Sequence, residues 1–239
     1  MVRAFVKLTV AVVSMTVSVS HASAQWGVTA LGVGEWDTNE TLVLLAGLSA
    51  GPGGSGLSPL VGAQASWVRF ETGDADVSVR TIRPYGGARY GFGSGSAYGT
   101  LGYAFQSRSE DIEGPIGVIG SAGDTDDGAV VSGGVEYWGT GGPLGAQALA
   151  SYNLGGESLW TRGRVTTRVS SLSSGGQVRL GGEVAYLTGD GYSIVQPGGV
   201  VAWHRSTNGL ILSAGAGVKI PDEGDNATYV KAEVVLPFH

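Results

Sequence analysis

Charged side chains that recur at every second position are the residues of this chain best placed to do chemistry. Arg162, Arg164 and Arg168 alternate with less polar residues, and Arg179 and Glu183 do so in a later segment. Successive side chains of a β-strand point to opposite faces, so this spacing gathers the charges on one polar surface. Such a surface could bind an anionic sugar or phosphate group, or its charges could pair and fill the interior. The candidates are Arg83, Arg89, Arg162, Arg164, Arg168, Arg179 and Lys231, with the carboxylates Glu35, Glu136, Glu183 and Glu233.

A second candidate for chemistry is the segment His204-Arg205-Ser206-Thr207-Asn208, in which a histidine and a serine lie two residues apart. On a strand both would share one face, as a general base and its nucleophile must. The segment resembles the His-x-Ser-Asn pattern of outer-membrane phospholipases and lipid A deacylases, which implies His204 as base and Ser206 as nucleophile. Thr207 interrupts the pattern and the segment runs into a turn. A structural histidine is the simpler interpretation, and we expect no enzyme.

Two acidic clusters raise the question of a bound metal ion. Neither has the spacing of an EF-hand loop, which also needs a glutamate at its twelfth position. The chain has no cysteine, which removes thiolate ligands and disulfides. We therefore expect neither a metal nor a cofactor, and the net charge of −6 gives no reason to expect a nucleic-acid partner. The clusters are Asp124, Asp126 and Asp127, and Asp222, Glu223 and Asp225.

The first 24 residues read as a secretory signal peptide. Arg3 and Lys7 form a basic start, residues 8–19 are apolar, and Ala22-Ser23-Ala24 is a small-residue cleavage site. The apolar stretch is shorter than the roughly 20 residues that a membrane-spanning helix needs. We therefore predict one exported domain over residues 25–239, rich in glycine, with 43 glycines in the chain.

The rest of the chain alternates apolar and polar residues in short segments bounded by Gly, Asp, Asn or Ser, which predicts strands. A polar face on nearly every strand fits the water-facing lumen of a membrane barrel, and aromatic residues near segment ends fit its interfacial girdles. A soluble β-sandwich is the alternative. We predict an all-β fold, a single antiparallel up-and-down transmembrane β-barrel of 12 strands. The strands are expected at 26–36, 40–50, 57–71, 77–91, 96–107, 128–139, 143–153, 158–169, 176–188, 192–205, 209–220 and 227–238. The aromatics are Trp26, Trp36, Trp67, Tyr90, Tyr137, Tyr152, Tyr186 and Trp203.

The acidic residues of the connectors support this strand count independently. Counted from the N-terminus, only the odd-numbered connectors contain Asp or Glu, which a wrong number of strands would scramble. The longest connector, 108–127, belongs to the same set, and outer-membrane barrels carry their longer loops outside the cell. We therefore expect both termini in the periplasm, with membrane lipid and lipopolysaccharide as partners. The acids are Asp37, Glu40, Asp74, Asp76, Glu110, Asp111, Glu113, Asp124, Asp126, Asp127, Glu157, Asp190, Asp222, Glu223 and Asp225.

Two resemblances concern the second half of the chain. The final strand, 227–238, alternates apolar residues up to Phe238 and resembles the C-terminal insertion signal of outer-membrane barrels, although His239 follows. The sequences Leu159–Arg162, Gly182–Ala185, Gly198–Trp203 and Gly209–Gly215 are similar to small outer-membrane barrels found with bacterial cellulose-synthesis clusters. These segments make up about a tenth of residues 25–239, and the resemblance implies a non-enzymatic role in exopolysaccharide export or surface attachment.

Three functions remain as hypotheses. The first is a barrel that supports exopolysaccharide secretion, or passive transport of a small anionic solute through a narrow polar lumen. The second is a lipid-modifying hydrolase that uses His204 and Ser206, and the third is a structural or adhesive barrel acting through loop 108–127. Barrels of eight strands have a filled interior, and barrels of 16 strands enclose an open channel. A barrel of 12 strands lies between these, so we weigh a plugged interior and a narrow pore equally.

Overall fold

The computed structural model describes residues 26–72, 75–112, 119–120, 127–138, 143–172, 176–205 and 209–238. Every regular element among them is a strand, and no helix there is long and apolar enough to cross a membrane. The signal peptide predicted at residues 1–24 lies outside the described residues. The strands are β1 (Trp26–Asp37), β2 (Leu42–Pro52), β3 (Gly56–Thr72), β4 (Ala75–Phe92), β5 (Gly95–Ile112), β6 (Ile119–Gly120), β7 (Gly128–Trp138), β8 (Leu144–Asn153), β9 (Ser158–Ser171), β10 (Gly176–Gly189), β11 (Tyr192–Arg205), β12 (Ile211–Pro221) and β13 (Ala227–Phe238).

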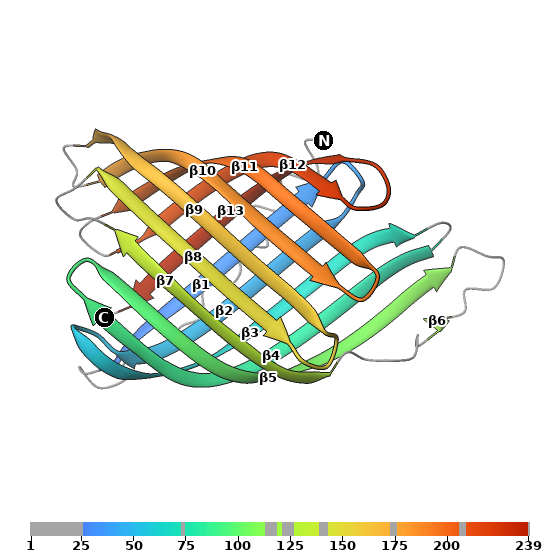
Figure 1. Cartoon of the computed structure of the whole chain (residues 1–239), viewed down its shortest axis with the longest axis horizontal. Helices are drawn as coiled ribbons and strands as arrows, with labels where there is room; N and C mark the ends of the chain where they lie inside the picture. The colour runs from blue at the N-terminus through green and yellow to red at the C-terminus, as the bar shows by residue number, and fades with distance from the viewer. Residues whose placement is uncertain are drawn as a thin grey trace.

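The strands form one closed antiparallel barrel. Consecutive strands pair with one another, and β1 pairs with β13, which joins the two ends of the sheet. The two-residue β6 extends from β5 outside this ring, so 12 of the 13 strands make the barrel wall. Figure 1 shows these strands as long, tilted ribbons around a single wall. The predicted up-and-down barrel of 12 strands is confirmed, and a two-sheet sandwich is excluded because the wall has no free edge.

Residues on the outer face of the wall are apolar. Val165, in the middle of β9, is 59% exposed, and Leu101 and Ile82 on other strands are more than half exposed. Among the positions whose side chains the structure describes, the register of the strand pairs places charged residues outward only near strand ends: Arg69, Asp76, Arg80 and Arg205. Exposed apolar surface of this extent is stable in lipid and unfavourable in water. The chain is therefore a transmembrane barrel of the outer-membrane type.

Exposed aromatic side chains form a band at each end of the wall. One band lies at the end where both described termini meet, and the other lies at the opposite end, which we call the far end. Aromatic rings favour these depths because an amphipathic ring is stable at the boundary between lipid and water. The termini band contains Trp26, Tyr90, Phe92, Tyr137 and Phe238, and the far-end band contains Tyr103, Phe105, Tyr152, Tyr186 and Tyr192.

Inward-facing glycines let large side chains lie flat against the inside of the wall. A Cβ atom on Gly134 of β7 would lie 2.8 and 2.9 Å from two ring atoms of Tyr98 on β5. A Cβ atom on Gly217 of β12 would lie 2.8 Å from a ring atom of Tyr229 on β13. Each ring therefore occupies the space that the neighbouring strand leaves empty. Part of the high glycine content has this packing role.

The acidic connectors gather at the far end, as predicted. The connectors after β1, β8, β10 and β12 all lie there, and each contains Asp or Glu. Four of the acids are corrected from connector to strand residues, because β1, β4 and β5 are longer at this end than the alternation of apolar residues indicated. These acids are Asp37, Asp76, Glu110 and Asp111. The predicted loop acids Asp74, Glu113, Asp124 and Asp126 lie outside the described residues.

Candidate functional site

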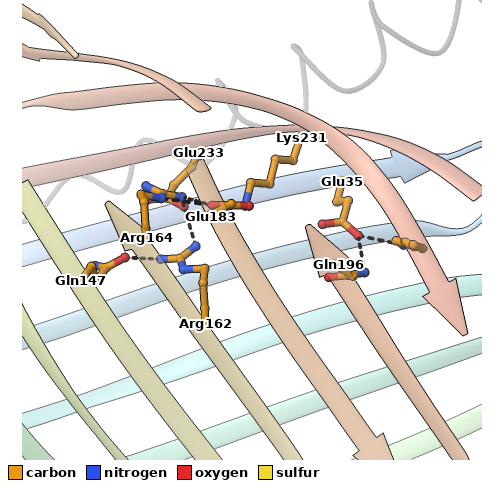
Figure 2. A network of polar contacts seen from close by, with 9 residues as sticks. Glu35, Gln147, Arg162, Arg164, Glu183, Gln196, Lys231 and Glu233 are labelled. Carbon is orange, nitrogen blue, oxygen red and sulfur yellow. Dashed lines mark hydrogen bonds and ion pairs between the residues drawn. The ribbon is translucent and has the colours of Figure 1, made fainter. Parts of the chain in front are cut away.

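The largest polar cluster inside the barrel is centred on Arg164. Its Nε atom donates to Glu183 Oε2 at 3.0 Å, and its Nη2 atom contacts Glu233 Oε2 at 3.0 Å. Lys231 forms an ion pair with the other oxygen of Glu183. These four side chains are buried and come from β9, β10 and β13 (Figure 2). Two cations and two carboxylates here neutralise one another, as buried charges must.

Arg162 extends this cluster towards β8. Its Nη1 atom donates to Glu233 Oε2 at 2.9 Å and its Nη2 atom to Gln147 Oε1 at 2.7 Å. The cluster reaches from β10 to β13 across two intervening strands because their inward residues are small. Gly215 of β12 is one of these, and a Cβ atom there would lie 3.1 Å from Lys231 Cε.

Arg83 begins a second polar chain on the other side of the barrel. Its Nη1 atom donates to Ser151 Oγ at 2.8 Å and lies 3.4 Å from Ser132 Oγ. Its Nη2 atom donates to Gln64 Oε1, and the two serine hydroxyls lie 2.9 Å apart. Both chains reach β8, at Ser151 and at Gln147, so together they run around much of the lumen wall. We call the two chains the mid-barrel belt: Gln64, Arg83, Ser132, Gln147, Ser151, Arg162, Arg164, Glu183, Lys231 and Glu233.

The mid-barrel belt contains more positive than negative charge. It has four basic side chains and two carboxylates: Arg162, Arg164 and Lys231 pair with Glu183 and Glu233, and Arg83 contacts neutral oxygens. Charges inside a low-dielectric wall act over a longer range than charges in bulk water. The excess of basic side chains therefore makes this level of the inner wall electropositive.

A separate ion cluster lies at the far end. Lys219 Nζ contacts Glu35 Oε1 and Asp37 Oδ2, each at 2.7 Å. Gln196 Nε2 lies 3.5 Å from the same Glu35 oxygen. Lys219 is on β12 and the two carboxylates are on β1, so the cluster crosses β13 and links the first strand to the last ones. Sequence reasoning missed Lys219, although it follows Ser213, Gly215 and Gly217 at alternate positions on one face.

In the part of the lumen near the termini, Arg89 and Arg179 form polar contacts separate from the mid-barrel belt. Arg89 lies 3.9 Å from Glu136, whose Oε1 atom accepts a hydrogen bond from Ser96 Oγ at 2.9 Å. Arg179 is buried and donates to Thr166 Oγ1 at 3.1 Å and to the backbone oxygen of Pro143 at 3.0 Å. Arg179 therefore ties β10 to β9 and to the start of β8. Its partner across the β9–β10 pairing is Arg168.

His204 does not form a base and nucleophile pair among the described residues. Its ring lies edge-on against Trp138, with 4.9 Å between centroids, and its Nε2 atom is buried without a hydrogen-bond partner there. Ser206 lies outside the described residues, so the pair remains an untested prediction. Within the described part of the chain, no group of acidic or histidine side chains could hold a metal ion.

The register places the predicted lumen residues on the inner face. The basic ones are Arg83, Arg89, Arg162, Arg164, Arg168, Arg179 and Lys231, and the acidic ones are Glu35, Glu136, Glu183 and Glu233. Their role as binding residues stays a prediction. Sequence reasoning missed the neutral members of the belt, Gln64, Ser132, Gln147 and Ser151, whose alternate spacing was the available signal.

Solved structures share the barrel fold of this chain. An outer-membrane channel from Pseudomonas putida F1 has a TM-score of 0.56 at 10% identity, over 92% of this chain and 98% of that one. The translocator domain of the autotransporter NalP from Neisseria meningitidis has a TM-score of 0.53 at 12% identity, over 99% and 96%. The KdgM porin, solved with disordered oligogalacturonate, has a TM-score of 0.50 at 11% identity, over 88% and 99%.

At these identities the likeness concerns the fold alone. No protein-family model matches the sequence, and no curated protein sequence matches it.

Proposed function

We propose that this chain is a narrow, non-enzymatic outer-membrane channel for small anionic solutes. The observation that carries the proposal is the excess of basic side chains in the mid-barrel belt, which contains four of them and two carboxylates, Glu183 and Glu233. A ring of like charge at the narrowest level of a channel sets which ions enter. The belt is the level at which this barrel selects.

Two of the solved structures with the same fold support a transport role. One is described as an outer-membrane channel, and the KdgM porin was solved with an oligosaccharide of acidic sugars. An acidic sugar combines a carboxylate with hydroxyl groups. The arginines, serines and amides of the belt offer complementary donors and acceptors.

The proposal extends to exopolysaccharides such as cellulose. The segments that resemble barrels of cellulose-synthesis clusters, such as Gly198–Trp203, lie on β11 and its neighbours. A sugar chain that passes the belt would meet the hydroxyl, amide and guanidinium groups that hydrogen-bond to sugar hydroxyls. Export of a polysaccharide is therefore the same transport function with a larger substrate.

The proposed orientation places both termini in the periplasm and the far end outside the cell. The acidic connectors at the far end would then face lipopolysaccharide, whose phosphates bind acidic protein groups through divalent cations. Glu157, Asp190 and Asp222 belong to three different connectors at this end. Protease or thiol-reagent labelling of single cysteines in those connectors on intact cells tests this orientation.

Ion currents through planar bilayers test the channel. We expect a current with a reversal potential that favours chloride over potassium in a salt gradient. Ser151→Asp adds a carboxylate at the position whose present hydroxyl lies 2.8 Å from Arg83 Nη1, and it should move the reversal potential towards cation preference. Arg205→Gln, on the outer face near the termini, should leave it unchanged. A folded, inserted barrel that carries no current, or a reversal potential that Ser151→Asp does not move, would contradict the proposal.

A further inference from the structure

We infer that Arg83, Tyr85 and Tyr98 form a subsite for the carboxylate-bearing ring of an acidic sugar, on the inner wall formed by β3 to β8. This inference deepens the proposed function and rests on it, because the ligand must reach the lumen. The subsite differs from the rest of the mid-barrel belt in its charge balance, its aromatic faces and its neutral hydrogen-bonding groups.

Arg83 differs from the other basic residues of the belt in its partners. Arg162, Arg164 and Lys231 each contact a glutamate. Arg83 is held only by the neutral oxygens of Gln64, Ser132 and Ser151, among the residues that the structure describes. Its half-buried guanidinium keeps an uncompensated positive charge that faces the lumen.

An uncompensated guanidinium at this position favours a carboxylate. Its planar donor groups match the two oxygens of a carboxylate, and the partly desolvated wall strengthens such a pair relative to water. The neutral groups that hold Arg83 orient it without neutralising it. Ser132, Ser151 and Gln64 also present hydroxyl and amide groups beside it, which suit the hydroxyl groups of a sugar.

Two tyrosines lie near Arg83, each flat against a glycine of a neighbouring strand. Tyr98 lies over Gly134 of β7, where a Cβ atom would be 2.8 Å from its ring. Tyr85 leans over Gly62 of β3, and its hydroxyl lies 3.4 Å from the backbone oxygen of Leu48. Tyr85 follows Arg83 by two residues on the inward face of β4, and Tyr98 pairs with Gly134, two residues from the Ser132 that contacts Arg83.

Aromatic faces beside an arginine indicate a sugar rather than a simple inorganic anion. The C–H faces of a pyranose ring pack against aromatic rings, whereas chloride or phosphate gains nothing from them. Tyr85 leans towards β3 and Tyr98 towards β7, so both rings share with Arg83 the inner wall formed by β3, β4, β5 and β7. The combination fits a uronic acid unit, with its carboxylate on Arg83.

Block of the ion current by a saccharide tests this subsite. The probes are a galacturonate trimer and maltotriose, a neutral trimer of similar size. For the wild-type channel we expect the galacturonate trimer to block the chloride current at a concentration at least tenfold lower than maltotriose. Arg83→Gln should remove most of this preference, Arg83→Lys should retain part of it, and Tyr98→Leu should weaken block by both sugars. Arg205→Gln is the matched control on the outer face.

The outcomes separate this inference from the proposed function. Equal block by both trimers, or galacturonate block that survives both Arg83→Gln and Tyr98→Leu, overturns the subsite while the channel stands. If the folded wild type carries no current, the proposed function fails, and calorimetric titration of the detergent-solubilised barrel with the galacturonate trimer then decides the subsite. Absence of binding there overturns it. If Arg83→Gln does not fold, Tyr98→Leu and Ser132→Ala are each compared with the wild type for block by the galacturonate trimer and by maltotriose.

Discussion

Glu183 on β10 and Lys231 on β13 form an ion pair across two intervening strands of the barrel wall. The pair exists because the inward residues between them are small, including Gly198 on β11 and Gly215 on β12. Glu183 also accepts a hydrogen bond from Arg164 Nε at 3.0 Å. One carboxylate thus holds a cation from β9 and another from β13.

Removing the charge of Glu183 should destabilise the barrel strongly. Glu183→Gln leaves Lys231 without a carboxylate and Arg164 with only Glu233, inside a wall where Arg164 is 3% exposed. Leaving a buried charge uncompensated costs about 3–5 kcal/mol. Urea unfolding of the barrel in lipid vesicles measures the change in the free energy of unfolding.

Glu136→Gln is the control for this change. The Glu136 side chain is 31% exposed and lies 3.9 Å from Arg89, whose side chain is 43% exposed. Exposed ion pairs contribute only about 0–1 kcal/mol, so this variant should unfold close to wild type. If both variants lost the same free energy of unfolding, burial of an ion pair would not determine how much that pair stabilises the barrel.

Gly134 should not tolerate a side chain. A Cβ atom there would lie 2.6 Å from Leu149 Cδ2 and 2.8 Å from the Tyr98 ring, so Gly134→Ala must displace one of them. Overpacking of this kind costs about 1–3 kcal/mol. Gly163→Ala is the control, because nothing lies within 4 Å of its Cβ position. Thermal unfolding followed by mobility in gels compares the two, and similar midpoints would contradict the packing role of Gly134.

An arginine on the outer face should be costly in proportion to its depth in the membrane. Val165 lies in the middle of β9 and is 59% exposed, and Val169 lies towards the end of the same strand and is 52% exposed. Val165→Arg should cost about 2–4 kcal/mol, and Val169→Arg about 0–1 kcal/mol near the interface. Unfolding titrations in lipid vesicles measure both. Equal costs at the two depths would argue against the membrane position assigned to β9.

The strands were predictable because alternation is a local property. The predicted ranges 192–205 and 227–238 coincide with β11 and β13. The exceptions have a physical reason. The last part of β5, up to Ile112, contains serines and charged residues in place of apolar ones. It is held by pairing with β4 and not by contact with lipid, so the alternation signal stops before the strand does.

The polar contacts inside the barrel were much less predictable. Alternation places Arg162 and Glu233 on the inner face, but they are 71 residues apart in sequence and three other strands lie between theirs in the wall. Whether they meet depends on the curvature of the barrel and on the small residues between them. For the same reason Lys219 and Asp37, 182 residues apart, could not be paired from the sequence.

Hydrolysis of lipid should be absent, although the segment around His204 resembles a catalytic pattern. His204 packs against Trp138 with 4.9 Å between ring centroids and faces inward, away from the lipid. Incubation of the purified barrel with phospholipid micelles should release no fatty acid, and His204→Phe should insert normally because an aromatic ring keeps the contact with Trp138. Fatty-acid release that His204→Ala and Ser206→Ala both abolish would establish the hydrolase instead.

Protonation of Asp222 should break the hydrogen bonds that its carboxylate accepts at the far end of the barrel. The backbone N–H of Ser193 donates to Asp222 Oδ1 at 3.0 Å, and the backbone N–H of Glu223 donates to the same oxygen at 3.1 Å. These donors favour the ionised carboxylate and lower the pKa of Asp222 below its ordinary value.

A lowered pKa means that the contact stabilises the fold above the pKa of the unfolded chain, about 3.9, and that this stabilisation is lost as the pH falls through the folded value. NMR titration should therefore give a midpoint for the Asp222 carboxyl carbon below that of a free aspartate, with the amide resonance of Ser193 moving at the same pH. Asp222→Asn should abolish the movement of the Ser193 amide. A Ser193 amide that still titrates in this variant would assign the titration to another group.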